Sequence, residues 1–203
     1  MAKQQLAGKR VAILVADGFE QEEMTEPRKA LEEAGAGTAL VSPSKHVVKG
    51  WKHTGWGEEF PVQVALEDAD AESFDALLLP GGVMNPDKLR MDPQALDFVR
   101  AFFDAEKPVA AICHAPWTLI DAGCVEGRDV TSWESLRSDL ENAGAAWFDR
   151  PVVVDHGLVT SRGPKDLPAF NKKMIEEFAV TEPDEGSDRP PARVVPGHRG
   201  SRS

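Results

Sequence analysis

The sequence of 203 residues has only two cysteines, Cys113 and Cys124. It also contains no apolar run near the about 20 residues that cross a bilayer, and its first residues lack the apolar core and cleavage site of a secretory leader. We therefore expect a cytoplasmic protein with no membrane partner. Because a lone disulfide is uncommon in a reducing compartment, the two cysteines are better interpreted as free thiols.

Clustered basic residues and phosphate-binding loops are also missing. The formal net charge is -11, and the lysines and arginines are scattered, which argues against a nucleic-acid partner. No Gly-rich phosphate loop follows any strand-like segment. The histidines away from Cys113 show no metal-ligand spacing, so we predict no metal and no organic cofactor. They are His46, His53, His156 and His198.

What is present is an ordinary globular composition, with 41% hydrophobic and 28% charged residues. The length suits one α/β domain over residues 1–180. From Thr181 the composition changes to Pro, Gly, Ser and balanced charge. We expect 181–203 to be a flexible tail, with an arm that docks on a partner subunit as the alternative.

Short apolar runs alternate with amphipathic segments along the chain. Runs at 9–16, 38–42, 74–79 and 108–112 predict strands buried on both faces of a parallel sheet. The spacing of apolar residues predicts helices between them, and the alternation indicates a doubly wound, mostly parallel sheet. The pattern at 45–63 predicts a small β excursion, and 151–154 with 158–161 a β pair.

Capping residues place several boundaries. Asp92 with Pro93 predicts a helix start, and Ser132 predicts the cap of a helix that carries Leu136 and Leu140. Pro80-Gly81-Gly82 ends a strand and opens a loop that we expect to run through Asp87. Leu167, Phe170, Met174 and Phe178 form the buried stripe of a final helix.

Cys113 is the candidate reactive residue, because it follows an apolar strand and precedes a helix. Helix N-terminal amides favour a thiolate and lower the pKa of a thiol. Small residues at Ala111 and Ala115 suit a sharp elbow, which predicts a strained backbone at Cys113. The alternative is a buried cysteine that acts as a small hydrophobic residue, the interpretation we give to Cys124.

Three further groups are expected near Cys113. His114 can move a proton, or it is a surface histidine. The amides of Gly82 and His114 can form an oxyanion hole, or Gly81-Gly82 is a simple turn. Glu20 follows the first strand and can donate a hydrogen bond to the thiolate, whereas its neighbours more often form a solvated helix face. Those neighbours are Gln21, Glu22, Glu23 and Glu26.

Four blocks of residues resemble the PfpI family of intracellular-protease-like proteins, within the class I glutamine amidotransferase-like superfamily. The resemblance covers residues 8–179. The blocks are Asp17-Gly18-Phe19-Glu20, Leu79-Pro80-Gly81-Gly82, Ala111-Ile112-Cys113-His114-Ala115-Pro116, and Val152 to Asp155 with Thr160 to Arg162.

The resemblance implies a flavodoxin-like three-layer sandwich, a Cys113 nucleophile and Glu20 as the carboxyl that contacts it. Archaeal members pair the histidine with an acid from a neighbouring subunit, and Asp87 is the matching position. Trp133 falls where family members place an aromatic residue near the site. Dimers and higher homo-oligomers are implied as partners.

Three functions compete. The first is a cysteine hydrolase acting on a peptide, in which Cys113 attacks the carbonyl and His114 moves the proton. The second is a cofactor-free glyoxalase or deglycase, in which the same thiolate adds to a small carbonyl such as methylglyoxal or to glycated groups. The third is a non-catalytic, redox-sensing stress protein or chaperone.

Overall fold

The central sheet has seven strands in the order β11-β12-β8-β7-β1-β3-β6. The computed structural model describes residues 4–180, so the predicted tail at 181–203 lies outside the described residues. Every pairing in this sheet is parallel except β11 with β12, which confirms the mostly parallel sheet. The strands are β1 (Arg10–Leu14), β3 (Gly37–Ser42), β6 (Val64–Ala65), β7 (Ala76–Leu79), β8 (Val109–Ile112), β11 (Val152–Asp155) and β12 (Leu158–Ser161).

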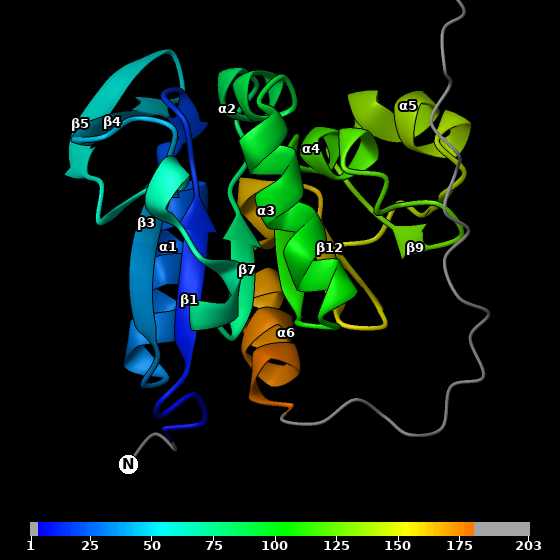
Figure 1. Ribbon diagram of the computed structural model, residues 1–203. Helices are drawn as coiled ribbons and strands as arrows, with labels where there is room; N and C mark the ends of the chain where they lie inside the picture. Colours follow the sequence, from blue (N-terminus) through cyan, green and yellow to red (C-terminus); the bar gives the residue numbers. More distant parts are fainter. Residues whose placement is uncertain (1–3, 181–203) are drawn as a thin grey trace, which may run out of the picture.

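Helices cover both faces of this sheet, as the alternation predicted (Figure 1). Residues of β1 alternate between two apolar clusters, because successive side chains of a strand point to opposite faces. α1 (Gln21–Glu33) and α6 (Leu167–Ala179) cover one face. α3 (Pro93–Asp104), α4 (Pro116–Asp121) and α5 (Arg137–Asn142) cover the other.

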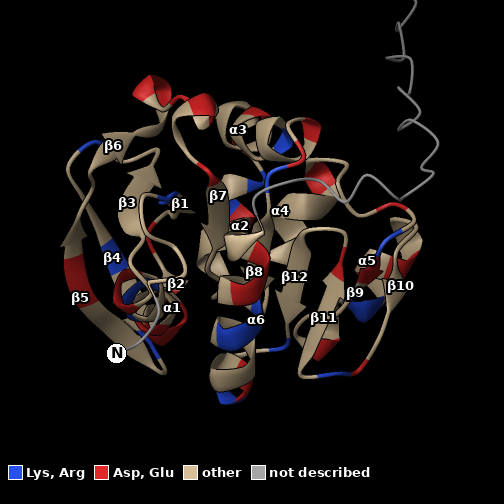
Figure 2. Ribbon diagram, turned by 90° about the horizontal axis from the view of Figure 1, so that it is seen from below, with Lys and Arg blue, Asp and Glu red and all other residues tan. Residues whose placement is uncertain are grey.

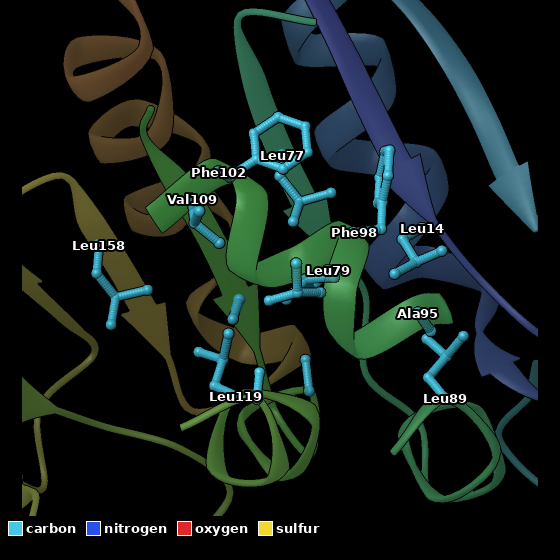
Figure 3. Packing of buried hydrophobic residues seen from close by; sticks show 14 of the residues in the cluster. Leu14, Leu77, Leu79, Leu89, Ala95, Phe98, Phe102, Val109, Leu119 and Leu158 are labelled. Atoms are coloured by element: carbon cyan, nitrogen blue, oxygen red, sulfur yellow. The ribbon is translucent and has the colours of Figure 1, made fainter. Parts of the chain in front are cut away.

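The strands at the centre are apolar because both of their faces are buried. β7, β8 and β12 contain no charged residue (Figure 2). Figure 3 shows Leu77 and Leu79 of β7 packing with Phe98 and Phe102 of α3. This continuous burial explains why near-continuous apolar runs in the sequence located the strands correctly.

A second, three-stranded sheet lies at one edge. The predicted excursion is an antiparallel hairpin of β4 (Val47–Lys52) and β5 (Gly55–Pro61). The short strand β2 (Phe19–Glu20) pairs in parallel with β4. A further pair, β9 (Asp129–Val130) with β10 (Ala146–Trp147), was not predicted. The hairpin therefore sits beside the segment that follows β1.

Two local predictions were wrong. The expected loop through Asp87 contains a helix, α2 (Met84–Leu89). This helix was not predicted because the segment between Gly82 and Asp92 is too short to show a helical pattern of apolar residues. Ser132 does not cap a helix, because its hydroxyl donates to Trp133 O and accepts from the Trp147 indole. A short 3-10 turn, Glu134–Leu136, leads into α5 instead. The Asp92 cap is confirmed, since its carboxylate accepts from the amides of Gln94 and Ala95.

No helix within residues 4–180 is long and apolar enough to cross a bilayer. The two cysteines are both free, as predicted.

The end of α2 offers a matched test of core packing. Leu89 is 1% exposed and Met91, two residues later, is 79% exposed. We expect Leu89→Ala to lower the free energy of unfolding by about 2–5 kcal/mol, because it leaves a cavity in the core. Met91→Ala should change it by less than about 0.5 kcal/mol. Urea titration of both variants measures the difference, and equal losses would contradict the assigned burial.

Candidate active site

The site forms where three parallel strands end side by side. β1, β7 and β8 are neighbours in register, so the loops after Leu14, Leu79 and Ile112 meet at one edge of the sheet. An open pocket of about 720 Å³ lies there. Its lining comes from these loops, from α1 and α2, from β4 and the β4–β5 turn, and from the segments that follow β9 and β12. The lining residues are Gly18, Glu20, Glu22, Glu23, Trp51, His53, Gly82, Val83, Met84, Cys113, His114, Trp133 and Pro164.

Cys113 sits on a strained elbow between β8 and α4. Its φ is +63°, a conformation that costs a non-glycine residue free energy, so the predicted strain is confirmed. Two backbone hydrogen bonds hold it there: the Cys113 amide donates to Ser161 O at 2.9 Å, and the Trp133 amide donates to Cys113 O at 2.9 Å. The elbow turns the thiol into the pocket while leaving the residue only 6% exposed.

The carboxyl that meets this thiol is Glu23, which corrects the expectation for Glu20. Glu23 is 0% exposed, and its Oε2 accepts from the Gly81 amide at 2.9 Å. Its Oε1 is buried without a well-directed hydrogen bond, and the carboxyl interacts with the Cys113 thiol. Glu20 lines the pocket farther out, where its carboxylate accepts a long hydrogen bond from the His53 amide at 3.5 Å.

Helical periodicity explains why Glu23 and not Glu20 points inward. β2 ends at Glu20 and α1 begins at Gln21, so Glu20 lies at the N-cap position, before the first helical turn, and its side chain makes no capping hydrogen bond. Glu23, Pro27 and Leu31 are spaced by four and share the buried face of α1. The run of acidic residues suggested a solvated face. The spacing of four residues from Glu23 to Pro27, and again to Leu31, was the signal that could have identified Glu23 as buried.

Gly81 and Gly82 do more than make a turn. A Cβ on Gly81 would lie 2.4 Å from Glu23 Oε2 and 2.7 Å from Cys113 Cβ. Gly82 has φ +79°, and a Cβ there would lie 2.6 Å from both Glu20 N and Gly18 O. The absence of side chains at these two positions lets the loop fit between α1 and the elbow.

A buried asparagine on α2 holds the same loop. Asn85 is 0% exposed and donates to Pro80 O at 2.8 Å, while its Oδ1 accepts from the Ala16 amide at 2.7 Å. It thereby ties the end of β1 to the loop after β7. Asn85 was not predicted from the sequence, because α2 was not predicted.

Burial dominates the electrostatics of the thiol and its carboxyl. Burial, followed by the charge of Glu23 and the hydrogen bond with it, raises the pKa of Cys113 far above its usual range, although hydrogen bonds from the Gly82 and His114 amides lower it. Burial raises the pKa of Glu23 to about 8. The predicted net lowering of the thiol pKa is therefore wrong, because α4 is short and both groups are desolvated. Both groups are therefore protonated at neutral pH, although the hydrogen bond with the Cys113 thiol lowers the pKa of Glu23.

His114 is buried beside the sulfur rather than exposed. Its Nδ1 lies 3.2 Å from Cys113 Sγ. Burial lowers its pKa to about 4, so the imidazole is neutral at pH 7. The ring stacks on Trp133 at a centroid distance of 5.8 Å and meets Trp117 edge-on at 5.3 Å. These aromatic contacts, rather than a carboxylate, orient His114 within residues 4–180.

The remaining predicted residues divide between the pocket and the surface. Trp133 lines the pocket, while Asp87 is exposed on α2 and is not among the residues that line it. Trp51 and His53 were not predicted, and they reach the pocket because β2 pairs with β4. Their separation of about thirty residues from Glu20 hid this proximity.

Comparison with known proteins gives this arrangement a context. Residues 9–177 match the model of the DJ-1/PfpI family. The chain belongs to the DJ-1/PfpI family. It is 46% identical to a Bacillus subtilis protein named "Putative cysteine protease YraA" over 167 residues, which are 82% of this chain and 96% of that one. It is 44% identical to general stress protein 18 of the same organism, over 83% of this chain and 96% of that one.

The fold is likewise similar to that of a solved family member. Drosophila melanogaster DJ-1beta superposes with a TM-score of 0.77 at 28% identity, covering 84% of this chain and 90% of that chain. The α/β architecture with helices on both sides of a mainly parallel seven-stranded sheet is thus DJ-1-like.

The two glycine environments allow a matched test of the loop. Gly123 has φ +74° and open space where a methyl group would lie, whereas a methyl group on Gly82 meets backbone atoms. We expect Gly123→Ala to cost about 1–2 kcal/mol of unfolding free energy from backbone strain alone. Gly82→Ala should cost clearly more, because the loop must also move. Similar losses in urea titrations would argue against the close approach of Gly82 to Glu20 and Gly18.

The raised pKa of Glu23 predicts a pH dependence of stability. Between its unfolded value near 4.5 and about 8, the folded state holds a proton that the unfolded state has lost. Stability must therefore fall as pH rises through this window, by up to about 1.4 kcal/mol per pH unit. Glu23→Gln should flatten the fall in unfolding free energy measured between pH 5 and pH 8. Glu33→Gln, at an exposed position of the same helix, should leave the wild-type slope.

Proposed function

We propose that the protein is a cysteine-dependent hydrolase that acts on the carbonyl group of a peptide-like substrate, with a role in stress protection. The observation that carries the proposal is Cys113 Sγ, which lies 3.2 Å from His114 Nδ1 and contacts Glu23 inside an open pocket. Its volume of about 720 Å³ suits an organic ligand larger than a three-carbon aldehyde. Two relatives named for protease and stress functions support the same interpretation.

The geometry gives each group a role in acyl transfer. Neutral His114 can accept the thiol proton at Nδ1 as the sulfur attacks the carbonyl carbon, and the carbonyl π electrons move to oxygen. The amides of Gly82 and His114 already donate to the sulfur and are close enough to the reacting centre to hold that oxyanion. His114 then gives the proton to the leaving amine. Water hydrolyses the thioester, which releases the acid and restores the thiol.

Glu23 favours a second candidate, a cofactor-free glyoxalase or deglycase. A carboxyl whose pKa is about 8 can both take and return a proton near neutral pH. After sulfur adds to the aldehyde carbon of methylglyoxal, Glu23 would move the proton of that carbon to the neighbouring one. Hydrolysis of the resulting thioester would give lactate. This internal oxidation and reduction needs no external oxidant.

A redox-sensing role has less support. Cys113 is 6% exposed and burial raises its pKa, so the thiolate that peroxide attacks is scarce.

Oligomerisation and a cytoplasmic location are also part of the proposal. Exposed Asp87 is available to a second copy of the chain, whose site would gain an acid beside His114. The two free cysteines agree with a reducing compartment. Loss of dimerisation without loss of activity would remove Asp87 from the mechanism.

Parallel assays on a casein-type substrate and on methylglyoxal test the proposal. We expect Cys113→Ala to lower turnover at least about a thousandfold, because no second nucleophile occupies its place. Cys124→Ala, which changes the other thiol outside the pocket, should keep wild-type turnover. Loss on casein supports the hydrolase, loss on methylglyoxal alone supports the glyoxalase, and equal turnover of wild type and Cys113→Ala would refute both.

A further inference from the structure

The lining of the pocket is rich in carboxyl groups. Glu20, Glu22 and Glu23 all line it, and its lining, drawn from the described part of the chain, includes no lysine or arginine. Lys52 lines an adjoining hollow of about 200 Å³, which shares Glu20, Glu22 and His53 with the large pocket. A ligand in the large pocket therefore meets carboxyl groups with no lysine or arginine among the residues that line it.

Ionisation of Glu20 and Glu23 is unfavourable in the free protein, and a positively charged ligand would make it more favourable. Burial and the charge of Glu22 both raise the pKa of Glu20, so its ionised form is disfavoured where it stands. Glu23 adds an oxygen, Oε1, that is buried and lacks a well-directed hydrogen bond. A cation near these groups would gain Coulomb attraction in a partly desolvated environment.

The aromatic side chain of Trp51 indicates which kind of cation would bind. The Trp51 indole lines the pocket, and its Nε1 donates to His53 O at 2.9 Å. Trp56 packs edge-on against it with ring centroids 5.6 Å apart, so Trp51 is held from two sides. Indole faces attract ammonium and guanidinium groups, with about 0.5–1 kcal/mol at exposed sites. Two carboxyl groups beside an indole ring therefore suit an organic cation.

A metal ion fits the same residues less well. Ligand atoms of Glu20, Glu22 and His53 lie within 4.8 Å of one another. The usual zinc sites of proteins combine two or more cysteine or histidine ligands, whereas this cluster offers one histidine, and an indole ring does not ligate metals. Glu22 is also explained as an acidic residue in the first turn of α1, where the helix dipole favours it.

We propose that Glu20, Glu22 and Trp51 form a cation subsite at the mouth of the pocket, which binds an ammonium or guanidinium group of the substrate while its carbonyl faces Cys113. The inference rests on the proposed function for the role of Cys113 and adds the substrate class: a carbonyl compound or peptide with a positively charged side chain.

Charged thiol reagents test the subsite without requiring turnover. Cys124→Ser serves as the background, so that Cys113 is the thiol labelled. Methanethiosulfonates with a trimethylammonium, a sulfonate or a neutral methyl group are compared by intact mass, each rate divided by its rate on free cysteine. We expect the cationic reagent to react at least tenfold faster than the anionic one. A ratio near that of free cysteine would overturn the proposal.

Substitutions locate the preference. Glu20→Gln and Glu22→Gln together should reduce the cationic-to-anionic ratio several-fold, whereas Glu33→Gln with Glu59→Gln removes two exposed carboxylates elsewhere and should not. Trp51→Leu should lower the rate of the ammonium reagent about two- to fivefold relative to the neutral one. An unchanged ratio in the first pair would overturn the subsite. So would protection of Cys113 by micromolar zinc that EDTA reverses, because the site would then be a metal site.

Peptide turnover separates failure of the subsite from failure of the proposed function. Matched fluorogenic peptides with lysine, arginine or glutamate beside the scissile bond are compared in the wild-type protein. Faster turnover of the basic peptides that Cys113→Ala abolishes supports both proposals. Turnover that depends on Cys113 but not on charge removes the subsite alone. If Cys113→Ala retains peptide turnover, the hydrolase proposal is wrong. The subsite proposal still stands in that case, provided that the protein with Cys113 prefers the cationic thiol reagent.

Discussion

The burial of the Glu23 carboxyl beside the Cys113 thiol is the interaction on which the rest of the site depends. The two groups can meet because Gly81 carries no side chain where a Cβ would lie 2.4 Å from Glu23 and 2.7 Å from Cys113. The Gly81 amide completes the arrangement by donating to Glu23. Gly81 is thus required by this close approach, whereas Gly82 is required by the approach of its loop to Glu20 and Gly18.

That approach sets the chemistry of the pocket. Burial raises the pKa of both partners, so both are protonated at neutral pH, and the neighbouring His114 stays neutral because burial lowers its pKa. A neutral base next to a protonated acid–thiol pair is suited to passing protons during attack on a carbonyl. The aromatic rings around His114 supply the orientation that a carboxylate supplies in many cysteine enzymes.

Elements with a strong local signal were predicted correctly. The apolar run before Cys113 gave β8, Asp92 gave the start of α3, and the buried stripe from Leu167 to Phe178 gave α6. α2 was missed because its six residues are too few for a periodic pattern, and the Ser132 cap failed because a tertiary contact with Trp147 uses its hydroxyl. Short segments depend on their neighbours more than on their own propensity.

The sequence by itself determined the alternating α/β architecture and the position of Cys113 on an elbow, because periodicity and small flanking residues are local properties of the chain. Tertiary structure decided which carboxyl meets the sulfur and which way the thiol pKa moves. Both depend on burial and on distances between residues far apart in sequence, as with Gly81 and Glu23. It also brought Trp51 and His53 to the pocket, through the pairing of two short strands that no local pattern records.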